Sequence, residues 1–175
     1  MIEVRRLTAP DLAAYRALHA HGLQHAALAF AETAEQDAAR ADAEVAALID
    51  GGMLWGAFDE ERLVGKLAMD FPPYPAFRHT RWLHAVYVHP DGRGRGVGAA
   101  LIEGALVQAR AEGVFCFLLW VHSQNPSARA LYERAGFREI GRISKGIRLG
   151  EAYADDVMMG RFFEPAGLDD VNTPT

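Results

Sequence analysis

The segment that most constrains the fold is a glycine-rich turn between an apolar stretch and a helical stretch. Residues 86–99 read VYVHPDGRGRGVGA, with glycines at alternate positions 94, 96 and 98. Glycine leaves out the side chain where a backbone must approach a ligand closely. The N–H groups at the start of the following helix are unpaired and carry partial positive charge. Such a turn predicts an anion site suited to a pyrophosphate, with Arg93 and Arg95 adding charge beside it.

Three other interpretations of this turn compete with a dedicated pyrophosphate cradle. A P-loop would end in Gly-Lys-Ser or Gly-Lys-Thr, and the chain has neither here. A Rossmann-type dinucleotide site would use Gly94, Gly96 and Ala99, but no acidic residue follows the next strand at Val121. A plain strand-to-helix turn would not need three alternating glycines flanked by arginines. The dinucleotide interpretation stays open as the weaker alternative.

Hydrophobic periodicity along the chain predicts one α/β domain. Apolar alternation or continuous apolar runs predict strands over residues 2–7, 53–58, 62–70, 82–89, 115–121, 137–143 and 155–163. Helical spacing predicts helices from about residue 9 to 20 and over 32–50, 99–111 and 126–135. We expect a mixed, twisted β-sheet with helices on both faces over residues 1–163, and a polar tail over 164–175.

Several details of this pattern are specific enough to be tested. Residues 32–50 are expected to form one amphipathic helix, with Ala34, Ala38, Ala41, Val45 and Leu48 on its apolar face. Residues 115–121 are continuously apolar, which is typical of a strand covered on both faces. Residues 22–30 show no clear period and are expected to be irregular, and the prolines of residues 71–80 predict a loop.

Composition disfavours several other classes of protein. The net charge of −5 over 175 residues argues against a nucleic-acid partner, because such domains carry a basic face. The lone cysteine, Cys116, excludes an internal disulfide and fits a cytoplasmic location. No apolar run is long enough to span a bilayer, so no membrane partner is expected. His19, His21 and His25 have no acidic or cysteine ligand nearby, so no metal is expected.

The glycine turn resembles the coenzyme A-binding signature of the GNAT acetyltransferases. Residues 93–98, Arg-Gly-Arg-Gly-Val-Gly, match the family pattern Arg/Gln-x-x-Gly-x-Gly/Ala. Residues 125–137 resemble the family's second block, an Asn followed by a short helix that carries a Tyr and ends in Gly-Phe. The resemblance covers residues 82–137. It implies a GNAT-like sheet with two splayed central strands, and transfer of an acetyl group from acetyl-CoA to a primary amine of a small molecule or peptide.

The resemblance also implies which residues hold the cofactor, acetyl-CoA. The strand before the turn would lend backbone groups to the pantetheine arm, as a strand does to an added neighbour. The glycine turn would hold the pyrophosphate, and the Asn block would contact the pantetheine or its surroundings. The implied cofactor-binding residues are Val86, Tyr87, Val88, Arg93, Gly94, Arg95, Gly96, Val97, Gly98, Ala99, Asn125, Ser127, Arg129 and Tyr132.

The catalytic residues implied by the resemblance depart from the family in one respect. Tyr132 is the implied general acid, since a phenol near the thioester can protonate the departing thiolate. The family's glutamate positions correspond here to Trp82 and Trp120, which cannot accept a proton from the amine. We expect His84 to substitute, because it shares strand parity with Trp82 and imidazole titrates near neutrality. A water chain or Glu32 stays open as an alternative base.

The acceptor amine is expected to bind in the segments outside the two blocks. Residues 22–32, 71–80 and 144–156 carry aromatic and acidic side chains that would suit a ring-bearing or cationic amine. The candidate substrate-binding residues are Phe30, Glu32, Tyr74, Phe77 and Tyr153. Two other functions stay open, a non-catalytic acyl-CoA-binding module and a Rossmann-like dinucleotide binder. A homodimer is a reasonable expectation for a chain of this kind.

Overall fold

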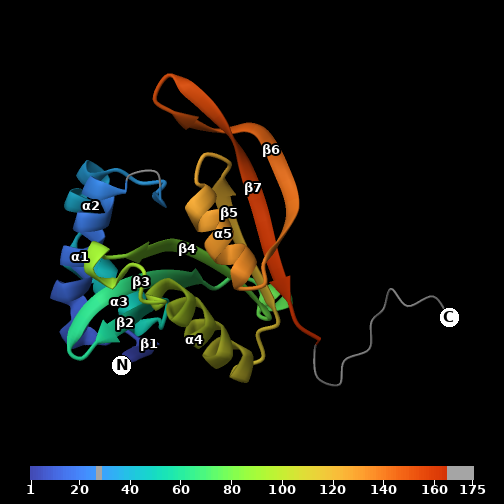
Figure 1. Ribbon diagram of the computed structural model, residues 1–175. Helices are drawn as coiled ribbons and strands as arrows, with labels where there is room; N and C mark the ends of the chain where they lie inside the picture. The colour runs from blue at the N-terminus through green and yellow to red at the C-terminus, as the bar shows by residue number, and fades with distance from the viewer. Residues whose placement is uncertain (27–28, 165–175) are drawn as a thin grey trace.

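The computed structural model of the chain describes residues 1–26 and 29–164 (Figure 1). One seven-stranded sheet has the strand order β1-β2-β3-β4-β5-β7-β6. Neighbouring strands are antiparallel except β4 and β5, which run parallel. The strands are β1 (Ile2–Arg6), β2 (Leu54–Asp59), β3 (Arg62–Asp70), β4 (Thr80–Val88), β5 (Cys116–His122), β6 (Arg138–Leu149) and β7 (Ala152–Phe162). The predicted mixed sheet is confirmed, and the Rossmann-like alternative is wrong because that fold needs a mostly parallel sheet.

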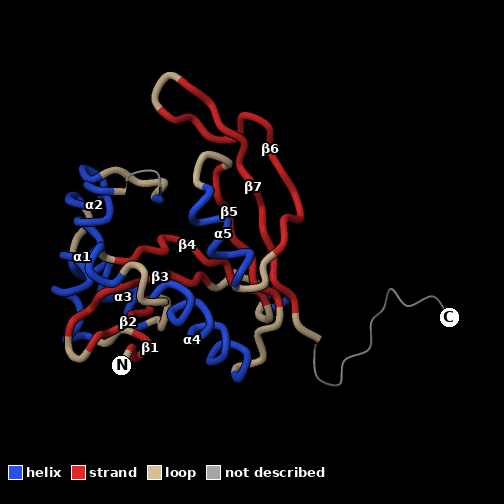
Figure 2. Tube along the Cα trace, in the orientation of Figure 1, coloured by secondary structure: helices blue, strands red, loops and turns tan. Residues whose placement is uncertain are grey.

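Helices cover both faces of the sheet, as expected (Figure 2). One face carries α1, α2 and α3, and the other carries α4 and α5. The helices are α1 (Leu12–His25), α2 (Ala34–Ala39), α3 (Asp42–Asp50), α4 (Val97–Ala111) and α5 (Pro126–Arg134). No helix in the described part of the chain is both long and apolar enough to cross a membrane.

Strand β2 shows how one sheet supports two apolar cores. Successive side chains of a strand point to opposite faces. Trp55 and Ala57 therefore pack in the core beneath α4, whereas Leu54 and Phe58 pack in the core beneath α1 and α3. The sheet is held from both sides, which fixes the positions of the strand ends that line the site.

Local sequence signals fix the ends of the helices. The Thr33 hydroxyl accepts the Gln36 N–H at 3.3 Å, and the Gln36 side chain accepts the Thr33 N–H, which forms a capping box at the start of α2. Helices α4 and α5 each stop just before a glycine with positive φ, Gly113 at 88° and Gly136 at 83°.

Strands β4 and β5 separate halfway along their length. Their pairing runs from Thr80 opposite Cys116 to Leu83 opposite Leu119, and it stops there although both strands continue. The C-terminal parts of the two strands, after Leu83 in β4 and after Leu119 in β5, thus diverge and leave a gap in the middle of the sheet. The splayed central strands implied by the resemblance are confirmed.

A bulge in β4 lies just where the two strands separate. Strand β3 pairs Lys66 with Tyr87 and Ala68 with His84, so three steps along β4 match two along β3. Ala85, inside this bulge, has φ of 50°, a conformation that costs about 1–3 kcal/mol for a residue other than glycine. The bulge interrupts the regular alternation of side chains between the two faces of the sheet, so His84 and the residues after the bulge no longer follow one alternating pattern.

The single helix expected over residues 32–50 is wrong, because the chain forms α2 and α3 with a break at Arg40. Arg40 has an extended conformation with ψ of 125°. Its carbonyl accepts a hydrogen bond from Arg16 at 3.2 Å, and its side chain binds Glu32 at 2.6 Å. These tertiary contacts replace the hydrogen bonds that would continue the helix, and Asp37 is buried where an apolar face was expected.

Three smaller expectations also need correction. Strand β5 is not covered on both faces, because Trp120 is 41% exposed and lines a cavity. Residues 22–25 are not irregular, since α1 continues to His25. Residues 144–149 belong to β6, so β6 and β7 form one long hairpin that extends beyond the rest of the sheet (Figure 1). The expected tail lies outside the described residues, apart from Glu164.

Candidate active site

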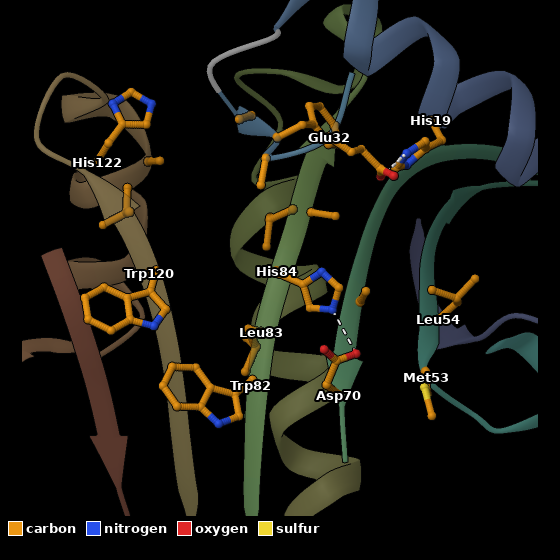
Figure 3. Close-up of a pocket in the computed structure, with 18 of the residues that line it drawn as sticks. His19, Glu32, Met53, Leu54, Asp70, Trp82, Leu83, His84, Trp120 and His122 are labelled. Atoms are coloured by element: carbon orange, nitrogen blue, oxygen red, sulfur yellow. Dashed lines mark hydrogen bonds and ion pairs between the residues drawn. The ribbon is translucent and has the colours of Figure 1, made fainter. Parts of the chain in front are cut away.

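A cavity of about 790 Å³ lies over the gap between β4 and β5. The α1–α3 layer forms one side of it, and α5 with the β6–β7 hairpin contributes to the other. Strands β3, β4 and β5 supply its central residues, which Figure 3 shows in close-up. A volume of this size suits a small-molecule site.

The glycine turn forms an open cradle at the start of α4. Gly94 and Gly96 have φ of 73° and 77°, and a Cβ built on either glycine would meet nothing within 4 Å. Gly96 is the N-cap of α4 and makes no side-chain cap, so the first N–H groups of the helix are left for a ligand. Gly98 instead packs closely against Leu131 of α5, with a built Cβ 3.3 Å from that side chain. The geometry fits an anion such as a pyrophosphate.

The two arginines of the turn are held near the cradle by different partners. Arg95 forms an ion pair with Asp59 at 2.7 Å, and Arg93 donates from Nε to the Val88 carbonyl at 3.2 Å. Both arginines are exposed, as is Ala99, whereas Val97 is buried under the turn. The cradle therefore combines open backbone N–H groups with two anchored positive charges.

The predicted pantetheine strand contributes differently at each position. Val86 lines the cavity. Tyr87 is buried, and its hydroxyl is 2.9 Å from His21 Nδ1 on α1. Val88 packs at the edge of the core beneath α4. Because the side chain of Tyr87 points away toward α1, its predicted role rests on its backbone.

The second predicted block lies across the gap on α5. Asn125 caps this helix by accepting the Ala128 N–H at 3.2 Å, and Ser127 donates its hydroxyl to Asn125 at 3.1 Å. Arg129 forms an ion pair with Glu139 at 3.2 Å. Asn125 also lines the cavity, whereas Ser127 and Arg129 are absent from its lining among the described residues.

Tyr132 of α5 lines the same cavity, although only 8% of the residue is exposed. Its ring makes an edge contact with Phe137 at 6.1 Å between centroids. Burial raises the pKa of Tyr132 above its ordinary value, because the phenolate would lose its solvation. The phenol therefore keeps its proton at neutral pH and is able to act as a donor.

His84 is paired with a carboxylate that the sequence did not single out. Its Nε2 is 2.9 Å from Asp70 Oδ1 at the end of β3, and both side chains line the cavity (Figure 3). When Nε2 carries the proton shared with Asp70, Nδ1 keeps a lone pair that accepts a proton. A carboxylate in this position orients the ring.

Two tryptophans lie beside His84 on the splayed strands. Trp82 and Trp120 both line the cavity, and their rings are nearly parallel at 8°, with centroids 6.4 Å apart (Figure 3). These residues occupy the positions where the resemblance places glutamates. The structure thus puts an aromatic surface, rather than a carboxylate, next to the histidine.

The other end of the cavity is charged. Glu32 binds His19 at 2.8 Å through one carboxylate oxygen and Arg40 at 2.6 Å through the other. His19 is buried, and its Nδ1 has no hydrogen-bond partner among the described residues. Burial lowers the pKa of His19, and the nearby Lys66 charge lowers it further. Glu32 is fully engaged in these contacts, which argues against it as a free base.

Lys66 is a wholly buried lysine beneath the bulge of β4. Its side chain is 0% exposed, and Nζ donates to the Ala85 carbonyl at 3.1 Å. The ammonium also lies over two aromatic rings, 4.9 Å from the centroid of Phe30 and 5.3 Å from that of Tyr15. Burial lowers the pKa of Lys66 to about 7, and the charge of Glu32 only partly offsets this effect.

The remaining predicted residues are spread over the molecule. Phe30 and Glu32 line the cavity, whereas Tyr74, Phe77 and Tyr153 are exposed and lie outside its lining. Their role in substrate binding stays a prediction. Histidines 21 and 25 stack on each other at 4.1 Å near the turn. Within residues 1–26 and 29–164, no group of three or more His, Cys, Asp or Glu side chains is placed to hold a metal ion.

Sequence reasoning missed three residues of the site. Lys66 is the lone charge inside the apolar strand of residues 63–69, and this isolated charge was the available signal for a buried functional lysine. Asp70 lies at the end of the predicted hairpin, where pairing with the next strand brings it near residue 84. Arg40 gave no signal, because it was placed inside a continuous helix.

The site combines an anion cradle, a split pair of parallel strands and an adjoining cavity. Sequence comparison identifies the protein family to which a site of this kind belongs. Residues 14–137 match the family model described as acetyltransferase (GNAT) family. This match covers well over half of the chain, so the chain belongs to the acetyltransferase (GNAT) family.

Individual relatives are similar to this chain over shorter segments. The L-methionine sulfoximine/L-methionine sulfone acetyltransferase of Pseudomonas aeruginosa is 35% identical over 74 residues, which are 42% of each chain. The L-amino acid N-acyltransferase MnaT of Escherichia coli is 37% identical over 68 residues, 39% of each chain. The chain therefore aligns with only about two-fifths of the length of these relatives. A putative acetyltransferase of Salmonella typhimurium, solved with its cofactor acetyl-CoA, has the same fold, with a TM-score of 0.81, 20% identity, and coverage of 98% of this chain and 99% of that one.

We expect Lys66 to make the free energy of unfolding rise with pH. Its pKa is about 7 in the folded chain and near its ordinary value of 10.5 when unfolded. Between these values the unfolded chain holds a proton that the folded chain has lost, so the stability penalty of burying Lys66 is full below about pH 7 and fades as the pH approaches about 10.5. Urea unfolding of wild type and Lys66→Met from about pH 6 to about pH 10 should show a flatter curve for the variant.

The chain provides a matched control, because its only other lysine, Lys145, is exposed on β6. Lys145→Met should keep the wild-type slope of stability against pH. Identical slopes for the two variants would show that Lys66 titrates normally in the folded protein.

Proposed function

We propose that this protein is an N-acetyltransferase that moves the acetyl group of acetyl-CoA to the primary amine of a small molecule or peptide by direct attack. The observation that carries the proposal is the open glycine cradle at the start of α4, next to the gap between β4 and β5. Gly94 and Gly96 leave open space beside the first backbone N–H groups of α4, which lets an anion approach them. The proposal also includes a cytoplasmic location, in line with the single cysteine.

The described residues fit acetyl-CoA in three places. The backbone N–H groups of residues 94–98 suit its pyrophosphate, with Arg93 and Arg95 anchored beside them. Beyond Leu83, β4 no longer pairs with β5, and this edge of β4 suits the amide groups of the pantetheine arm; Asn125 faces the same cavity. When bound, the cofactor supplies an acetyl group already activated as a thioester.

Two side chains of the cavity have complementary proton-transfer roles in this proposal. His84, oriented by Asp70, takes the proton from the attacking ammonium or amine. Tyr132 donates a proton to the departing sulfur, because a phenol holds its proton at neutral pH and lies in the same cavity.

The acceptor is proposed to include amino acids. Two relatives are named for amino acids or amino acid derivatives as substrates. Arg40 lines the same cavity as His84 and binds Glu32 through one guanidinium nitrogen. The remaining donors of its guanidinium suit the carboxylate of such an acceptor. A homodimer stays a prediction.

A non-catalytic acyl-CoA-binding module is the second candidate, favoured by the tryptophans that stand at the family's glutamate positions. Both functions predict acetyl-CoA binding, but only the enzyme releases free thiol when an amine is added. The His84–Asp70 pair favours the enzyme, because a binding module needs no oriented base.

The cradle is tested by replacing Gly96 with glutamate. The new carboxylate would meet the cofactor phosphates and would strain a residue with φ of 77°, so we expect acetyl-CoA binding measured by calorimetry to be lost. Gly113→Glu is the matched control, because Gly113 also has positive φ and open space but lies at the far end of α4. Equal binding by wild type and Gly96→Glu would show that the turn is only architectural.

The base is tested by the pH–rate profile of His84→Ala. We expect the turnover number to fall by roughly 10²–10⁴-fold at neutral pH, and by less at high pH, where the amine is already neutral. Asp70→Asn should cause a smaller loss in the same pH range. His25→Ala, on the exposed end of α1, serves as the control. A profile of His84→Ala that overlays that of the control would remove His84 from the mechanism.

The acid is tested by Tyr132→Phe, which removes the hydroxyl and keeps the ring contact with Phe137. We expect turnover to fall by roughly 10²–10⁴-fold, with little change in acetyl-CoA affinity, because the proton is needed only as the thiolate departs. Stopped assays of thiol release, together with calorimetry, separate the two effects. Unchanged turnover would exclude Tyr132 as the acid.

A further inference from the structure

We propose that the acceptor amine carries a planar aromatic ring on a short aliphatic linker, and that Trp82 and Trp120 form the subsite for this ring. This inference rests on the proposed acetyltransferase function and narrows its substrate class. Neither tryptophan has a role in the proton transfers assigned to His84 and Tyr132.

The first argument is the exposure of an apolar surface inside a cavity. Trp120 is 41% exposed although it lines the cavity, and its ring is nearly parallel to that of Trp82. Tyr74 and Phe77 are exposed too, but on the outer loop between β3 and β4, away from the cavity. A large apolar side chain left open within a cavity favours a ligand that covers it.

The second argument is the register of the strands. Trp82 pairs with Leu118, and Leu83 with Leu119, so one further step along the parallel strands sets Trp120 level with His84 across the gap. Trp82 lies two residues before His84, or about 6.8 Å along the strand. The aromatic surface therefore begins beside the proposed base and extends away from it.

The third argument is the difference between the two ends of the cavity. In Figure 3, His84 lies between the two tryptophans and the Glu32–His19 pair. The charged end is occupied by mutual contacts of Glu32 with His19 and Arg40. An amine held at His84 that directs an apolar group toward the tryptophans places that group on the open aromatic surface, where a ring gains from both area burial and ring contact.

The test compares acceptors that differ only in the ring. Phenethylamine and ethylamine form one pair, and phenylalanine and alanine form a second pair that carries a carboxylate. Thiol release should show a higher kcat/KM for the ring-bearing member of each pair. Trp120→Ala should lower kcat/KM for phenethylamine by roughly 10- to 100-fold and leave ethylamine almost unchanged.

Two further variants separate a ring subsite from general damage. Trp120→Phe keeps an aromatic surface and should restore most of the preference. Phe162→Ala removes an exposed aromatic side chain outside the cavity and should leave every acceptor unaffected. Wild-type turnover without any preference for the ring, or an equal loss on both amines in Trp120→Ala, would overturn the subsite.

A binding measurement keeps the ring subsite distinct from the proposed reaction. Quenching of tryptophan fluorescence by phenethylamine, with coenzyme A present, should be saturable in wild type and weakened in Trp120→Ala. Such binding without thiol release from any amine would retain the ring subsite and reject the acetyltransferase function. No saturable binding and no ring preference would reject the ring subsite itself.

Discussion

The hydrogen bond from the buried ammonium of Lys66 to the carbonyl of Ala85 is the contact on which the site depends. The bulge in β4 takes this carbonyl out of the regular ladder, and an unpaired buried carbonyl is costly. A lysine from the neighbouring strand supplies the missing donor and lies over the rings of Tyr15 and Phe30. With the bulge held in this way, β4 turns from β5 after Leu83, and the sheet opens where the cradle and the cavity meet.

The charges around this contact are arranged in a chain from the core to the cavity. Lys66 lies deepest, His19 and Glu32 come next, and Arg40 reaches the cavity from the break between α2 and α3. Each group is placed by a different element. The four groups therefore lie close to one another only when the α1–α3 layer is correctly packed on the sheet. The wall of the acceptor site is thus coupled to the packing of the N-terminal helices, while the cradle is built on the start of α4 and anchored by Asp59, Val88 and Leu131.

The glycine turn of residues 93–98 and the Asn block of residues 125–137 predicted the cofactor side of the fold. Glycines and helix starts act through the backbone, and their spacing can be recognised in the sequence. The mixed sheet and the approximate bounds of β1 to β5 followed from periodicity, and the splayed strands followed from the resemblance to the GNAT family. The break at Arg40 could not be predicted, since residues 32–50 keep a helical pattern that only contacts with Arg16 and Glu32 override. The partnership of His84 with Asp70 depends on the register across a bulge, which strand parity alone does not reveal. The acceptor side is built from such tertiary contacts. Of the five candidate substrate-binding residues predicted from the sequence, only Phe30 and Glu32 line the cavity.

The scarcity of lysine has a chemical consequence for a protein proposed to handle an acetyl donor. Of the 18 basic side chains, 16 are arginines, whose guanidinium groups stay protonated and are poor nucleophiles. One of the two lysines is sealed under the bulge, and the other lies on the projecting β6–β7 hairpin. The folded surface therefore offers spontaneous acylation a single lysine side chain among the described residues. Apart from a free α-amino terminus, the lysine on that hairpin is the side chain that an amine-reactive dye or crosslinker would mark, which gives a probe of its surroundings without any engineered cysteine.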